Sequence, residues 1–78
     1  MRSFQPGDLV EIIPEMSGSK VFGWLPEPND INAVLFEKPI LYGLYIGKSP
    51  CYNYKGYHEV LTESNIYTFY ELQVQFIQ

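Results

Sequence analysis

His58 and Cys51 are the two side chains best suited to nucleophilic or metal chemistry, and each is the single residue of its type. They lie seven positions apart, across a predicted hairpin loop. A thiolate–imidazole pair also needs a group to orient the base and donors for an oxyanion, and the sequence offers neither. One His and one Cys cannot fill a four-ligand zinc shell. We therefore predict no catalytic and no metal site, with His58 an ordinary strand residue and Cys51 a loop residue.

Acidic and glycine residues likewise lack the spacing of known ion or phosphate sites. The carboxylates of the first half are scattered without calcium-loop spacing: Asp8, Glu11, Glu15, Glu27, Asp30 and Glu37. Gly43 and Gly47 lie in or beside a predicted strand, with no helix after them to form a phosphate-binding loop. No cofactor is expected.

Tyrosines are concentrated around one loop. The chain is 17% aromatic, with seven Tyr, and Tyr52, Tyr54 and Tyr57 lie on or beside the predicted loop 48–56. Tyr supplies rigid contact area with a polar tip and is enriched at protein interfaces, so we predict a protein-facing surface here. The structural alternative is that tyrosines only pack on strands, as expected for Tyr42 and Tyr45 on opposite faces of one strand.

The single Trp lies in a proline-braced segment, Trp24-Leu25-Pro26-Glu27-Pro28. If this segment lies near the loop that carries Tyr52, a Trp and Tyr cleft fringed by Glu27 and Asp30 would suit a basic or extended peptide. In the alternative, Trp24 folds back and plugs one open end of the fold. The sequence leaves both open.

Five strands are predicted, at 8–13, 40–47, 57–62, 66–70 and 74–77. Val10 and Ile12 alternate with their neighbours in the first, which indicates one buried face. Gly43 predicts a bulge or sharp bend in the second. A tight hairpin at 63–65 is expected to place Asn65 at positive φ, and 71–73 forms a short turn.

Between the first two strands, residues 15–39 are interrupted by Gly and Pro and are predicted to be largely irregular. A short strand at 20–25 fits the pattern. Residues 31–37 fit a strand, and 32–36 fit instead a single helical turn capped by Asp30. This order of elements predicts one domain over 1–78, a five-stranded Src-homology-3-like (SH3-like) barrel with a long irregular loop after the first strand. Closing the sheet removes exposed edges. Val10, Ile46, Val60 and Ile66 are expected to meet inside it.

The amino-acid composition indicates which classes of partner and which cellular compartment to expect. The formal charge is −4 with five cations, a poor supply for neutralising phosphates, so nucleic acid and anionic membranes are disfavoured as partners. A single Cys precludes an internal disulfide, which favours host cytoplasm or a virion over secretion. No apolar run approaches the roughly 20 residues of a membrane span, and the first residues lack a signal-peptide pattern.

Four segments carry a family resemblance: Pro6-Gly7-Asp8-Leu9-Val10, Gly43-Leu44-Tyr45-Ile46-Gly47, His58-Glu59-Val60-Leu61-Thr62 and Ile66-Tyr67-Thr68-Phe69-Tyr70. Together they resemble the small SH3-like proteins of tailed bacteriophages, including those that infect cyanobacteria. The resemblance implies a phage origin and no shared catalytic residues. The Ala-Leu-Tyr-Asp-Tyr motif of signalling SH3 domains is missing, so proline-rich ligands are not expected.

From these observations we predict a non-catalytic protein-binding module, a phage accessory or virion-decorating protein whose partner is another viral or host protein. The alternative is a regulatory binder that captures a host protein or a small molecule. A nucleic-acid-binding barrel is the third reading, and self-association is left open.

Overall fold

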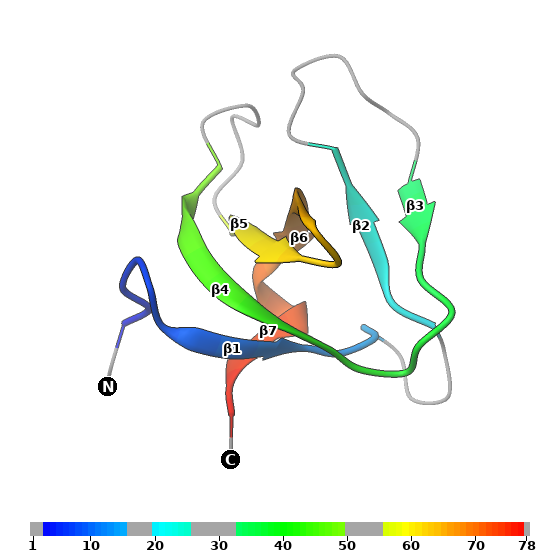
Figure 1. The fold of residues 1–78 in the computed structure, drawn as a ribbon, viewed down its shortest axis with the longest axis horizontal. Helices are drawn as coiled ribbons and strands as arrows, with labels where there is room; N and C mark the ends of the chain where they lie inside the picture. Colours follow the sequence, from blue (N-terminus) through cyan, green and yellow to red (C-terminus); the bar gives the residue numbers. More distant parts are fainter. Residues whose placement is uncertain (1–2, 16–19, 26–32, 50–55, 78) are drawn as a thin grey trace.

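The computed structural model describes residues 3–15, 20–25, 33–49 and 56–77, and these form one antiparallel sheet (Figure 1). Its elements are β1 (Leu9–Ile12), β2 (Phe22–Trp24), β3 (Ala33–Leu35), β4 (Leu41–Lys48), β5 (Tyr57–Thr62), β6 (Asn65–Tyr70), the 3₁₀ turn η1 (Glu71–Gln73) and β7 (Val74–Phe76). The described strands follow the order β3-β2-β6-β5-β4-β1-β7. The all-β prediction is confirmed.

The segment predicted to be irregular contributes two short strands. β2 and β3 pair antiparallel, with Phe22 opposite Leu35, and β2 reaches β6 through the pair Trp24 and Thr68. The strand alternatives for 20–25 and for 31–37 are therefore confirmed, whereas the helical turn is wrong. Asp30 lies outside the described residues. The sheet consequently has seven described strands rather than five.

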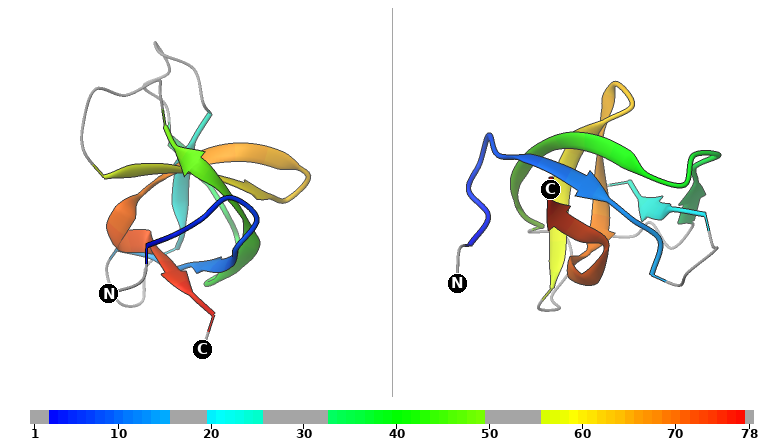
Figure 2. Two further views of the ribbon diagram at one scale, coloured as in Figure 1. Left: turned by 90° about the vertical axis from the view of Figure 1, so that its left-hand side faces the viewer. Right: turned by 90° about the horizontal axis from the view of Figure 1, so that it is seen from below.

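The sheet curls strongly without closing (Figure 2). Among the described strands, β3 and β7 end the order and do not pair with each other, so the prediction of a sealed sheet is wrong. Both edge strands have three residues, which limits the ladder that either could form. The buried side chain of Gln73 bridges part of the gap instead: its Nε2 donates to the Phe22 carbonyl (2.9 Å), and its Oε1 accepts from the Tyr70 amide (3.0 Å).

The hydrophobic core lies on the concave face. Val10 and Val60 are fully buried as predicted, but Ile46 is 37% exposed and Ile66 is only half-buried. Ile46 is wrong as a core residue because Leu41 and Tyr45 take the inward positions of β4, and side chains alternate along a strand. The full core comprises Val10, Ile12, Val21, Phe36, Leu41, Tyr45, Val60, Phe69 and Val74.

β4 bulges, though not at Gly43. Its register with β5 is regular through Tyr45 and shifts between Tyr45 and Gly47. Gly43 is instead a point of close approach, because a Cβ there would overlap the Leu61 carbonyl and lie 2.7 Å from Val60 Cγ1. The glycine lets the backbone of β5 approach β4 closely at this point of the sheet.

The hairpin between β5 and β6 turns at Glu63 and Ser64, which have φ of 51° and 66°. Two consecutive positive φ values match a type I′ turn, whose twist suits a two-residue hairpin. The prediction that Asn65 takes the positive φ is wrong, because Asn65 already pairs with Thr62 at the start of β6. The predicted turn at 71–73 is confirmed as η1.

Candidate functional site

Three rings form a cluster that we call the aromatic surface: Trp24, Tyr57 and Tyr70. Trp24 comes from β2, Tyr57 begins β5, and Tyr70 ends β6 opposite Tyr57. The ring centroids of Trp24 and Tyr57 lie 6.2 Å apart, and those of Tyr57 and Tyr70 lie 5.6 Å apart, both edge to face. All three side chains are half-buried. Each ring therefore combines fixed geometry with an accessible portion that a partner can contact.

The six residues predicted to bind a partner are only partly described. Trp24 and Tyr57 border the two loops on which the prediction depended, and the structure brings their rings together. The remaining four lie outside the described residues: Glu27, Asp30, Tyr52 and Tyr54. Tyr70 was missed, although a tyrosine at the end of the strand that pairs with β5 could have been identified from the predicted hairpin.

An acid and a buried hydroxyl lie beside the aromatic surface. Glu59 follows Tyr57 by two positions on the same face of β5, and burial raises the pKa of its carboxyl. Thr68 pairs with Glu59 on one side and with Trp24 on the other. Its Oγ1 is buried and has no hydrogen-bond partner among the described residues. Glu59 thus places negative charge near the rings.

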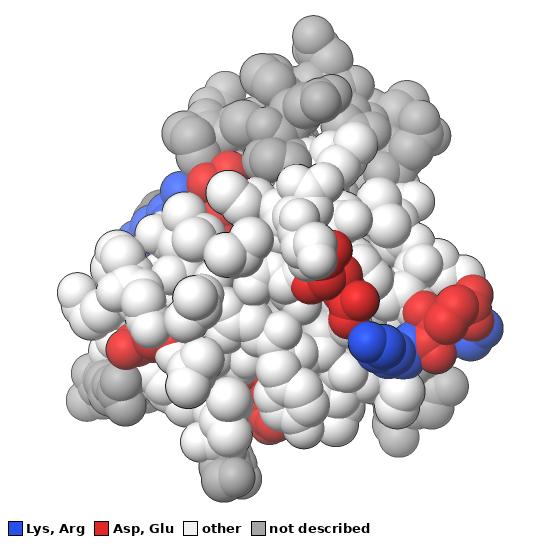
Figure 3. Space-filling view, viewed as in Figure 1, with Lys and Arg blue, Asp and Glu red and all other residues white. Residues whose placement is uncertain are grey.

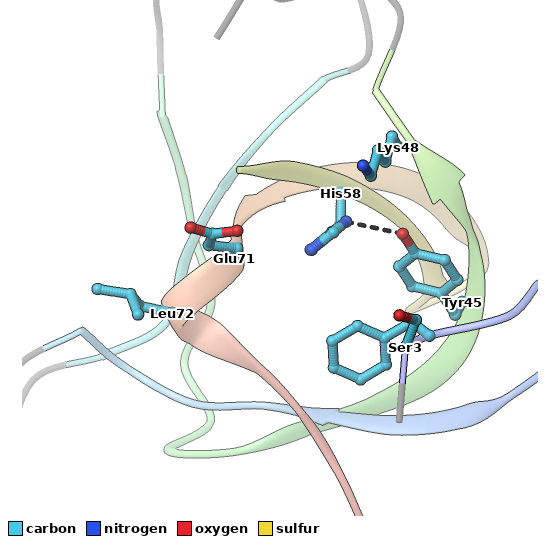
Figure 4. Close-up of a pocket in the computed structure, with 7 residues that line it drawn as sticks. Ser3, Tyr45, Lys48, His58, Glu71 and Leu72 are labelled. Carbon is cyan, nitrogen blue, oxygen red and sulfur yellow. Dashed lines mark hydrogen bonds between the residues drawn. The ribbon is translucent and has the colours of Figure 1, made fainter. Parts of the chain in front are cut away.

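A separate pocket of about 400 Å³ opens at one end of the concave face (Figure 4). The N-terminal segment, β4, β5 and η1 all contribute to it. Its lining consists of Ser3, Phe4, Tyr45, Lys48, His58, Glu71 and Leu72.

The β4 bulge determines which side chains reach this pocket. Tyr45 pairs with Val60 before the bulge, whereas Lys48 pairs with His58 after it. Without the extra residue, strict alternation would direct Lys48 to the face opposite Tyr45. The bulge therefore brings Lys48 to the same face as Tyr45 and His58.

Aromatic rings build one wall of the pocket. Phe4 stacks on Tyr45 with centroids 5.2 Å apart, and it meets His58 edge to face at 5.6 Å. Phe4 also packs against Phe76 at 4.5 Å, which connects the N-terminal segment to β7. These contacts hold the wall in place from three parts of the chain.

His58 and Tyr45 share a hydrogen bond of 2.7 Å between the imidazole Nδ1 and the phenolic oxygen. Burial raises the pKa of Tyr45. Burial also lowers the pKa of His58, against a smaller raising effect of Glu71, and Lys48 lowers it further. Both groups are therefore neutral at neutral pH. The hydrogen bond is compatible with either neutral tautomer of His58, and when the phenol donates to Nδ1, the imidazole proton lies on Nε2. Figure 4 shows this second nitrogen pointing away from Tyr45, toward the side of Glu71.

Sequence reasoning placed His58 on a strand, which is confirmed, and did not connect it to a pocket. The pocket position could have been predicted from alternation. His58 precedes Val60 by two positions and Thr62 by four, so all three side chains lie on the same, inward face of the strand. Cys51 lies outside the described residues. Within the part of the chain that the structure describes, no three His, Cys, Asp or Glu side chains lie close enough together to hold a metal ion.

Charged side chains on the face shown in Figure 3 lie in small groups, without a single basic patch. Positive and negative side chains lie next to each other in two surface ion pairs, Lys20 with Glu37 (2.7 Å) and Lys38 with Glu63 (2.9 Å). Among the residues described, no helix has the length and apolar character to cross a membrane.

Comparison with family models, with curated proteins and with solved structures found no match to this chain. Functional inference therefore depends on the two sites described above.

Proposed function

We propose that this chain is a non-catalytic protein-binding module that docks through the aromatic surface. The contact between Trp24 and Tyr57 carries the proposal, because it unites the ends of two loops that are distant in sequence. Trp and Tyr are the residue types that most often dominate binding energy at protein interfaces. Glu59 on the same face, together with Glu27 and Asp30 in the sequence, favours a basic or extended segment as the occupant.

An SH3-like architecture is part of this proposal. Five neighbouring strands of the sheet, in the order β7-β1-β4-β5-β6, correspond to the five strands predicted for the barrel. The η1 turn comes immediately before β7, the last strand in the chain. On this reading, the β2–β3 hairpin is the long loop folded against β6. The likeness to small phage proteins extends the proposal to a phage accessory or virion-decorating protein that acts in the host cytoplasm or on the particle.

Affinity capture tests the binding proposal, with purified virions and host lysate as the two sources of partner. Trp24→Ala and Tyr57→Ala should each reduce recovery of the captured protein about tenfold or more, as expected for anchor residues at an interface. Tyr42→Ala is the matched control, since Tyr42 is 61% exposed on β4 and has no ring contact with the aromatic surface among the described residues. Equal recovery by all three variants, or no captured protein from either source, would reject the proposal.

Capture of a small molecule is the second candidate function, and the pocket beside His58 favours it. At about 400 Å³ the pocket falls within the range of ligand sites, about 300–1,000 Å³. It combines apolar walls with a few polar groups, which is the usual composition of such sites.

A further inference from the structure

The pocket offers a hydrogen-bond donor beside an acceptor. In the tautomer in which the Tyr45 phenol donates to Nδ1, the proton on His58 Nε2 is the donor, and the Glu71 carboxylate is the acceptor. Both side chains line the pocket, and Figure 4 shows the second ring nitrogen of His58 on the side that faces Glu71. A ligand that satisfies both must present an acceptor next to a donor on one edge.

The charges of the lining favour an uncharged ligand. Lys48 and Glu71 both line the pocket, and they have opposite signs. A carboxylate or phosphate would be attracted by Lys48 and repelled by Glu71, whereas an amine would meet the reverse. A neutral molecule with a strong local dipole can use both side chains and be repelled by neither.

The apolar lining favours a flat molecule. Phe4 forms the aromatic wall with Tyr45, and Leu72 adds an aliphatic side chain that is 70% exposed. Aromatic rings prefer offset stacked or edge-to-face partners, so a planar ring gains most from this wall.

We propose that this pocket binds a planar heterocycle with a lactam edge, in which a ring N–H stands beside a carbonyl oxygen. The N–H donates to the Glu71 carboxylate, and the carbonyl accepts from His58 Nε2 and from Lys48. Hypoxanthine, guanine, uracil and thymine share this edge, and its carbonyl oxygen has two lone pairs that can accept from both His58 and Lys48. Adenine and cytosine also carry a donor beside an acceptor, but the acceptor beside their amino group is a ring nitrogen with a single lone pair. The site is distinct from the aromatic surface and goes beyond the proposed protein-binding function.

Two matched nucleoside pairs test the edge chemistry by ligand-observed NMR and calorimetry on the full chain. Inosine and 1-methylinosine share a purine frame, and uridine and 3-methyluridine share a pyrimidine frame, but only the first of each pair has the ring N–H of the lactam edge. The unmethylated member should bind at least about tenfold more tightly, because the N-methyl group removes the donor to the Glu71 carboxylate and occupies the space of that hydrogen bond. Equal affinity within both pairs, or no binding of inosine or uridine at millimolar concentration, would overturn the proposal.

A variant pair tests the residue assignment. Glu71→Ala should weaken inosine or uridine binding about tenfold, the effect expected for one lost charge-assisted hydrogen bond. Glu37→Ala is the control, an exposed acid whose described contact is the surface pair with Lys20. Circular dichroism establishes that both variants are folded. Undiminished binding by folded Glu71→Ala would contradict the assignment.

The same edge occurs on free nucleosides and on bases within a strand. Titration with a short oligouridylate, alongside uridine, distinguishes the two sources. Tighter binding of uridine identifies the free molecule as the ligand, and tighter binding of the oligonucleotide identifies a strand. Either result supports the lactam assignment, while binding of 3-methyluridine as strong as that of uridine would refute it.

Discussion

Replacing Gly43 with alanine tests how closely β4 and β5 must approach. A Cβ at this position would overlap the Leu61 carbonyl oxygen and would lie 2.7 Å from Val60 Cγ1 and 3.1 Å from Thr62 Cβ. The carbonyl belongs to a paired strand and cannot move without disturbing the ladder, and Val60 is fully buried in the core. The added methyl group must therefore push the two central strands apart.

Gly47 provides the matched control within the same strand. A Cβ there meets no atom of the described residues within 4 Å, and Gly47 is not among the glycines with positive φ. Alanine at Gly47 restricts the unfolded chain without a clash and should change stability by about +0.4 to +1 kcal/mol. Overpacking at Gly43 should cost about 1–3 kcal/mol. For a domain of this size, each kcal/mol corresponds to about 4–8 °C in Tm.

Urea unfolding followed by the fluorescence of the single Trp, with a thermal melt by circular dichroism, measures both variants. We expect the midpoint of Gly43→Ala to lie well below that of the unmodified chain and the midpoint of Gly47→Ala to lie at or above it. If the two variants unfold at the same urea concentration, the close approach of β4 and β5 is not what requires glycine, and the packing argument fails.

Three further changes test individual side chains. Gln73→Met removes the side-chain bonds to the Phe22 carbonyl and the Tyr70 amide, and it should lower the free energy of unfolding by about 2–4 kcal/mol in urea titration; an unchanged midpoint would contradict the bridging role. Thr68→Val replaces an unpartnered buried hydroxyl with a methyl group and should be neutral or stabilising by up to about 1 kcal/mol, so a clear loss in the same assay would reveal a partner for that hydroxyl. His58 has its folded pKa lowered by burial, so its contribution to stability is present above the unfolded value of about 6.5 and is lost as pH falls below it. Urea midpoints from pH 8 to pH 5 should therefore decline more steeply for the unmodified chain than for His58→Asn, and parallel curves would refute the buried neutral imidazole.

Much of the sheet could be predicted from alternation and turn residues. Val10 and Ile12 identified the buried face of β1, and the turn at 71–73 followed from its place between two apolar segments. Ile46 failed because Leu41 and Tyr45 take the inward positions of β4, and a nearly continuous apolar segment does not reveal which of its two faces points inward. β2 and β3 remained alternatives because three-residue strands are too short to show a period.

The candidate sites were predictable to a different extent. The predicted cleft between the long connection and the hairpin loop lies largely outside the described residues, and the described contact of Trp24 with Tyr57 borders both segments. The pocket could not be anticipated in the same way, because it needs Phe4 to fold across the end of the sheet and Lys48 to be redirected by the bulge. Both are long-range arrangements, whereas residue patterns report local alternation.

The aromatic surface and the pocket lie on opposite faces of the sheet, and residues that are adjacent in sequence contribute to one or the other. Tyr57 faces the aromatic surface and His58 faces the pocket. Likewise Tyr70, the last residue of β6, belongs to the aromatic surface, and Glu71, the first residue of η1, lines the pocket. A ligand in the pocket and a protein on the aromatic surface would therefore approach from different sides of the sheet, so we expect no competition between them. Because Tyr57 and Tyr70 also pair directly across β5 and β6, a ligand that fixes His58 and Glu71 should steady both rings and strengthen protein binding. Measuring captured protein with and without inosine decides the matter, since displacement by inosine would mean that the two sites overlap and that the alternation argument is wrong.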